Sequence, residues 1–249
     1  MPKFSNANTK LKRLYQIPEL APFLVKRKIY SFDLLSGHSC PFASKCLSKA
    51  IVTDAGRRIQ DGPKTEFRCY SASQEVLFTG VYNLRKGNFD ALRGKSKKEM
   101  FSILENALPK NAGVVRLHSA GEFFSQDYFD AWVAIATSNP GILFYAYTKA
   151  LPYWIKRLKE IPENLVLTAS YGGRRDDLIE AYNLRSVRVI NHPDEANGLE
   201  IDHDDSRSAR PSFRNENFAL LVHGINPKGS KAAEGIKRMK SEGVVFSYS

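Results

Sequence analysis

Apolar residues in the middle of the chain, from about residue 96 to residue 200, alternate between strand-like and helix-like spacing. Short apolar runs have the length and composition of buried strands, at residues 114–118, 142–147, 165–170 and 187–191. Between these runs, apolar residues recur at the three- and four-residue spacing of one helix face. This spacing predicts helices over residues 96–107, 125–135, 153–161 and 176–182, and Ser96 with Glu99 forms a capping-box pattern at the first.

Strands and helices that alternate with short connections predict an α/β fold with a mainly parallel sheet and helical crossovers. Because such crossovers are right-handed, the sheet is expected to be either open or a partial β/α barrel. We expect one domain over residues 1–249. Its parts are a basic N-terminal segment (1–30), a cysteine-bearing loop region (31–95), the β/α repeats (96–200) and a basic C-terminal segment (201–249).

Polar residues follow each predicted strand, and ligand sites of α/β folds gather at the carboxyl ends of the strands. The candidate cofactor-binding residues are Ser119, Gly121 and Glu122 after the first strand, Lys149 after the second and Arg174 after the third. Any one of these ends also fits an ordinary polar turn. The recurrence at successive strands is what indicates a site.

The net charge is +11, and the excess of lysine and arginine is concentrated in residues 1–30 and 228–240. Such segments could bind the phosphate backbone of a nucleic acid, or they could be solvated helix faces. No compact nucleic-acid-binding motif is present to decide between these alternatives. The chain also has no apolar run of the ~20 residues that a membrane-spanning helix needs, and no apolar signal core. We therefore expect a cytoplasmic protein with reduced thiols and no membrane partner.

Cys40, Cys46 and Cys69 are the cysteines of the chain. An odd number excludes complete disulfide pairing. Three thiolates are one ligand short of a closed zinc site, which His38 or His118 could complete. They would also leave one iron of a 4Fe–4S cluster without a cysteine ligand. The spacing leaves cluster, zinc and three small buried hydrophobic residues as open alternatives.

The other candidate ligands give weaker signals. His118 follows a predicted strand and is the best remote metal ligand, whereas His192, His203 and His223 are expected to be structural or exposed. The acidic run at residues 202–205 could bind a divalent cation, but an exposed loop is the simpler interpretation.

Several stretches of the chain form a recognisable set: His-Ser-Cys-Pro at residues 38–41, Arg-Cys-Tyr at 68–70, and the segments 116–125, 145–149 and 220–230. Taken together, they resemble a phage protein family, the Gene product 88 family. The resemblance covers most of residues 30–240. It implies a phage-encoded 4Fe–4S protein in the host cytoplasm, with Cys40, Cys46 and Cys69 as cluster ligands and the fourth position open.

The resemblance also implies a distant kinship with radical S-adenosylmethionine enzymes, in which three cysteines hold a cluster on a partial β/α barrel. Their Gly-Gly-Glu motif contacts the amine of S-adenosylmethionine, and Ala-Gly-Glu at residues 120–122 occupies a comparable place here. The cysteine spacing departs from the usual pattern of those enzymes. Water, His118, Glu122 or a substrate could fill the fourth cluster position. The leading hypothesis is therefore a cluster protein with redox or radical chemistry, and the alternative is a nucleic-acid-binding protein with a structural cluster or zinc.

Overall fold

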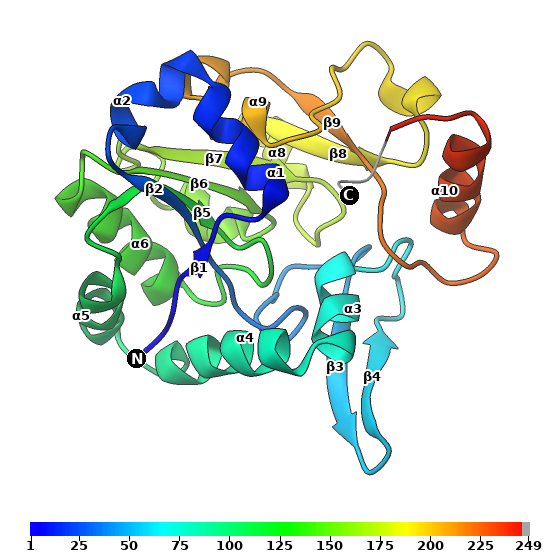
Figure 1. Ribbon diagram of the computed structural model, residues 1–249, viewed down its shortest axis with the longest axis horizontal. Helices are drawn as coiled ribbons and strands as arrows, with labels where there is room; N and C mark the ends of the chain where they lie inside the picture. Colours follow the sequence, from blue (N-terminus) through cyan, green and yellow to red (C-terminus); the bar gives the residue numbers. More distant parts are fainter. Residues whose placement is uncertain (246–249) are drawn as a thin grey trace.

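Seven strands form one open sheet in the computed structural model, which describes residues 1–245 (Figure 1). The strands, in their order across the sheet, are β1 (Ser5–Asn6), β2 (Lys28–Phe32), β5 (Ala112–Leu117), β6 (Leu143–Thr148), β7 (Leu165–Ser170), β8 (Ser186–Ile190) and β9 (Phe218–Leu221). All neighbours pair in parallel except β1, which is antiparallel to β2. The predicted α/β fold with a mainly parallel sheet and helical crossovers is confirmed. The sheet does not close into a barrel, because β1 and β9 are separate edges.

Between β2 and β8, each parallel strand of the sheet lies beside the one before it, and right-handed crossovers place the helices that connect these strands on one face of the sheet. The helices of this face are α5 (Lys97–Ala107), α6 (Gln126–Ser138), α7 (Leu151–Ile155) and α8 (Asp177–Ala181). Their apolar side chains share one core with alternate residues of the strands, such as Leu117 of β5 and Phe144 of β6.

The opposite face of the sheet is covered by the N-terminal segment (Figure 1). Its elements are α1 (Thr9–Lys12), the 3₁₀ turns Arg13–Gln16 and Pro18–Leu20, and α2 (Ala21–Leu24), and α9 (Ser206–Ala209) packs beside them. Val114 of β5 and Tyr145 of β6 face this second core. Successive side chains of each strand therefore point to opposite faces of the sheet. The face covered by α5 to α8 is apolar, whereas the face covered by the N-terminal segment also carries polar groups.

A long insertion between β2 and β5 holds all three cysteines. It contains the hairpin β3 (Ser48–Thr53) and β4 (Gly56–Asp61), which projects from the body of the molecule, followed by α3 (Tyr70–Leu77) and α4 (Thr79–Leu92) (Figure 1). At the other end of the chain, α10 (Lys231–Ser241) packs against β8 and β9. Two further 3₁₀ turns cover Pro193–Ala196 and Pro211–Phe213.

The predicted helix over residues 153–161 differs from the structure. Helix α7 begins at Leu151, with Pro152 in its first turn, and ends at Ile155. Leu158, which the apolar pattern included, lies 39% exposed in the turn that follows. The apolar pattern of the sequence continues past the residues that are buried against the sheet, so it predicted a longer helix than the structure has. Within residues 1–245, no helix is long and apolar enough to cross a membrane.

Replacing Ser96 by Ala should lower the free energy of unfolding by about 1 kcal/mol. The Ser96 side chain accepts a hydrogen bond from the Glu99 N–H, and the Glu99 carboxylate accepts one from the Ser96 N–H, so both halves of the capping box form. Urea unfolding measures the effect. Ser102→Ala, in the same helix but away from the cap, is the control, and an equal loss in both variants would contradict the prediction.

Candidate functional site

The three cysteines line one small cavity of about 140 Å³, hereafter the small cavity. The ends of three neighbouring strands contribute other polar residues, among them His118 and Glu122 after β5, Lys149 after β6 and Ser170 at the end of β7. Of the residues proposed from the sequence, Ser119 and Gly121 also line it. The structure thus brings together all of those residues except Arg174, which is exposed and lines neither this cavity nor the larger one described below.

The loop carrying Cys40 and Cys46 is held by backbone contacts. Gly37 adopts a left-handed φ of 71°, and its N–H donates to the Cys40 Sγ at 3.2 Å. In an irregular cluster-binding loop, backbone N–H groups that are not used in a helix or strand are expected to donate hydrogen bonds to cysteine sulfurs. On the far side of the loop, the Ser44 and Lys45 N–H groups both donate to the carbonyl of Gly172, which follows β7.

Cys69 is positioned by contacts from its neighbours in the chain. The Tyr70 hydroxyl donates to the Ser119 carbonyl at 2.8 Å, and the Arg68 N–H donates to the Asn226 Oδ1 at 2.8 Å. The His223 ring packs on Tyr70 with the ring centroids 4.6 Å apart. Segment 220–230, which carries part of the family resemblance, therefore helps to position Cys69.

Burial raises the pKa of the Cys40 thiol well above its usual value, and the nearby Glu122 carboxylate and the other two thiols raise it further. Burial also raises the pKa of Cys46, although the Lys149 ammonium opposes this shift. Bare thiolates are therefore disfavoured here, and a cationic group would have to accompany three of them.

His118 carries a polar atom without a partner. Its Nε2 lies 3.0 Å from the Tyr128 hydroxyl, while its buried Nδ1 has no hydrogen-bond partner. Burial lowers the pKa of His118 to about 3, so the ring is neutral at neutral pH. The residue also has a φ of 63°, in the sparsely populated left-handed region. A neutral imidazole held in a strained backbone beside three thiols is suited to contact a group in the small cavity.

The Glu122 carboxylate joins the ends of two strands. It accepts hydrogen bonds from the Phe123 N–H at 2.8 Å, the Thr148 hydroxyl at 2.9 Å and the Lys149 N–H at 2.6 Å. Burial raises its pKa, and these donors oppose the shift. The main effect of Glu122 is thus to fix β6 against the loop after β5, with its carboxylate at the wall of the small cavity.

Replacing Gly121 by Ala should destabilise the protein by about 1–3 kcal/mol, the range typical of overpacking. Gly121 has a φ of 84°, and an added Cβ would lie 2.6 Å from the Leu34 Cβ and 2.7 Å from the Ser39 Oγ. Gly94→Ala is the matched control, because Gly94 has a similar φ of 74° with nothing within 4 Å. Denaturant unfolding of both variants measures the cost of the clash, and equal stabilities would contradict it.

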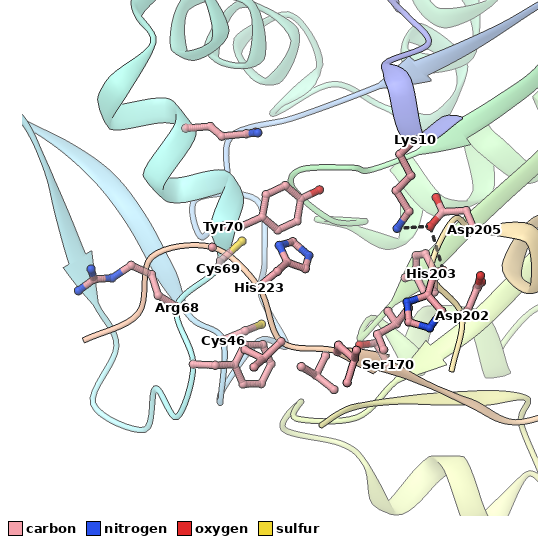
Figure 2. A pocket seen from close by; sticks show the side chains of 18 of the residues that line it. Lys10, Cys46, Arg68, Cys69, Tyr70, Ser170, Asp202, His203, Asp205 and His223 are labelled. Atoms are coloured by element: carbon pink, nitrogen blue, oxygen red, sulfur yellow. Dashed lines mark hydrogen bonds and ion pairs between the residues drawn. The ribbon is translucent and has the colours of Figure 1, made fainter. Parts of the chain in front are cut away.

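A second and larger cavity of about 460 Å³, hereafter the large cavity, adjoins the first (Figure 2). The two share Cys46, Cys69, Tyr147, Lys149 and Ser170 as lining residues. In Figure 2 the two sulfurs lie on one side with Tyr70 and His223, whereas Lys10, Asp202 and Asp205 lie on the other. Cys46 and Cys69 thus lie between the small cavity and a cavity of the size that small molecules occupy.

Asp205 anchors the charged side of the large cavity. Its carboxylate lies 2.5 Å from the Arg116 Nη1 and 2.7 Å from the Lys10 Nζ, and it accepts hydrogen bonds from the hydroxyls of Tyr145 and Tyr147. Burial alone would raise the pKa of Asp205, but the two cations lower it to about 2. The carboxylate is therefore charged, fully buried and completely paired.

The expectation that residues 202–205 form an exposed loop is wrong for two of them, since Asp202 is 3% exposed and Asp205 is fully buried.

His203 and His223 both line the large cavity. Among the remaining histidines, His38 is exposed and its Nε2 lies 2.8 Å from the Ala50 carbonyl, whereas His192 pairs with Glu242. The sequence offered one indication of His223, because this residue lies in segment 220–230, which carries the resemblance to the family.

Within residues 1–245, no group of three or more His, Cys, Asp or Glu side chains is arranged to hold a metal ion. The side-chain geometry therefore gives direct support neither to zinc nor to a 4Fe–4S cluster, and both stay predictions. The basic segments are also partly used within the molecule, because Lys10 pairs with Asp205 and Arg238 pairs with Asp194 and Glu242. Binding to nucleic acid stays a prediction.

A profile of the Gene product 88 family matches residues 2–241. The chain belongs to this family. Among curated proteins it is similar to the Gene 88 protein of Mycobacterium phage L5, with 27% identity over 90 residues, which cover 32% of this chain and 38% of that protein. The chain thus matches less than two thirds of that relative's length, and no solved structure matches. The Gene product 88 match, together with a phage relative, supports the phage origin that the resemblance implied.

Proposed function

We propose that this Gene product 88 protein binds a 4Fe–4S cluster in the small cavity through Cys40, Cys46 and Cys69. The observation that carries the proposal is the convergence of three cysteines, 6 and 23 positions apart in sequence, on one cavity at the carboxyl ends of parallel strands. A cluster fits these donors better than a single ion does, because each thiolate binds a different iron and the sulfurs need not meet at one point.

Residues around the small cavity would adapt it to such a group. The Gly37 N–H already donates to a cysteine sulfur, and the Lys149 ammonium offsets part of the thiolate charge. The unpartnered Nδ1 of His118 is available to donate to a sulfur or to occupy the fourth position. A bound cluster supplies electron transfer, or Lewis-acid binding of a ligand at an iron that has no cysteine.

Anaerobic reconstitution with iron and sulfide tests the proposal. We expect a brown protein with about four iron and four sulfide per chain. Zinc at one equivalent with no visible absorption, or failure to retain iron, would refute it.

The finer proposal is that the open iron takes S-adenosylmethionine, as it does in radical S-adenosylmethionine enzymes. The place of Ala-Gly-Glu at residues 120–122 supports it, since Glu122 lines the small cavity beside the cysteines. Three donors of the chain already engage the Glu122 carboxylate, so a ligand amine would have to share it. Incubation of the reduced protein with S-adenosylmethionine should yield 5′-deoxyadenosine, and its absence from a protein with full iron would exclude this chemistry.

A further inference from the structure

We propose that the large cavity binds a small amphipathic anion, with a carboxylate or phosphate group held by Lys149 and an apolar body against the aromatic and aliphatic wall. The cavity exists in the chain itself, so this inference does not depend on the cluster. Its volume of about 460 Å³ lies within the range of small-molecule sites.

The charge of the lining favours an anion. Its ionisable side chains include four cations, Lys10, Arg68, Arg116 and Lys149, but two carboxylates, those of Asp202 and Asp205. Both carboxylates are engaged by the chain: Asp205 by Arg116, Lys10 and two tyrosines, and Asp202 by the N–H groups of residues 204, 207 and 208. Neither is left to attract a cationic ligand. Arg68 pairs with Asp61, and Lys10 and Arg116 pair with Asp205, so among the cations of the lining Lys149 is left to receive an anion.

Lys149 is the cation best placed to receive the ligand. The residue is 8% exposed, and its Nζ donates to the Ser170 Oγ at 2.5 Å. No carboxylate lies within ion-pair distance of Lys149 in the described part of the chain, and the buried Glu122 carboxylate interacts with its charge from further away. An ammonium has three donors, so most of its capacity is open towards the two cavities that it lines.

The remaining wall suits an apolar or aromatic body. Phe67, Tyr70 and the His223 ring lie there with Leu221 and Val222. Burial and the nearby Lys10 and Arg116 lower the pKa of His223 to about 4, so this ring is neutral and adds no competing charge. A ligand with its anionic group at Lys149 would occupy a cavity that Cys46 and Cys69 also line.

Calorimetric titration with phenyl phosphate, benzoate and the neutral benzamide tests the inference. We expect at least one anion to bind and benzamide not to bind. Phenyl phosphate alone would identify a phosphate ligand, and benzoate alone a carboxylate ligand. Lys149→Gln should weaken anion binding by about tenfold or more, the effect of losing a hydrogen bond to a charged group, and Lys149→Arg should restore part of it.

Lys156→Gln is the matched control, because it removes the same charge from an exposed position outside both cavities. Binding no tighter for the anions than for benzamide would overturn the inference. So would unchanged affinity in Lys149→Gln, which would mean that this ammonium serves only the sulfurs. Titrations before and after reconstitution, with iron measured each time, separate this outcome from failure of the cluster proposal.

Discussion

Replacing Cys69 by Ala is expected to reduce the iron retained after anaerobic reconstitution from about four per chain to a small fraction, with loss of the visible absorption. Cys69 lines both cavities and precedes α3, so its loss removes a ligand from the insertion that carries all three cysteines. Two thiolates cannot hold a cubane cluster against solvent and free thiols. Iron and sulfide analysis and the absorption spectrum measure the result.

Ser44→Ala is the matched control for Cys69→Ala. Ser44 lies in the same insertion, and its bond to the Gly172 carbonyl uses the backbone N–H, so removing its side-chain oxygen leaves that bond in place. The control should retain iron and colour. If Cys69→Ala kept about four iron, or if Ser44→Ala lost as much, the three-cysteine assignment would be wrong. Unfolding of the metal-free variants separates a lost ligand from a lost fold.

The sequence predicted the centre of the fold because that part is built from local patterns. Strands β5 to β8 are short apolar runs, and α5 begins at a capping box, so their own residues specify them. Strands β2 and β9 were not predicted. β2 begins within the basic segment 1–30 and β9 has only four residues, so neither gives a local pattern as clear as those of the central strands. Their place depends on the strands they pair with, β5 for β2 and β8 for β9, rather than on a pattern in their own residues.

The sequence predicted those residues of the candidate site that have a distinctive residue type or follow a predicted strand. It missed residues whose burial depends on partners far away in the sequence. Cys40, Cys46, His118 and Glu122 stood out by type or position. Asp205 did not, since an acidic run is usually solvated. Its burial depends on Arg116, 89 positions away in the sequence, which pairs with it on one face of the sheet. No local pattern contains that pairing, whereas the family resemblance did identify segment 220–230.

Asp205→Asn is expected to lower the free energy of unfolding at neutral pH by about 3–5 kcal/mol, the cost of breaking a buried ion pair. The substitution keeps the shape of the side chain. It also suits the φ of 63° at this position, because Asn adopts left-handed backbone readily. What is lost is the charge, and the loss leaves Arg116, itself 8% exposed, without its counter-ion. Urea unfolding at neutral pH measures the difference, and Asp194→Asn, at an exposed ion pair, should change little.

The pH dependence of this difference provides a second and independent check. The pKa of Asp205 is about 2 in the folded protein, below the usual value of 3.8. A depressed folded-state pKa contributes stability that is present above the unfolded-state pKa and is lost as pH falls through the folded-state pKa. The advantage of the parent protein over Asp205→Asn should therefore be constant near neutrality and shrink as the pH falls from about 4 towards 2. A difference that stayed the same down to pH 2 would mean that the substitution acts by disturbing packing, and that the ion pair with Arg116 contributes little.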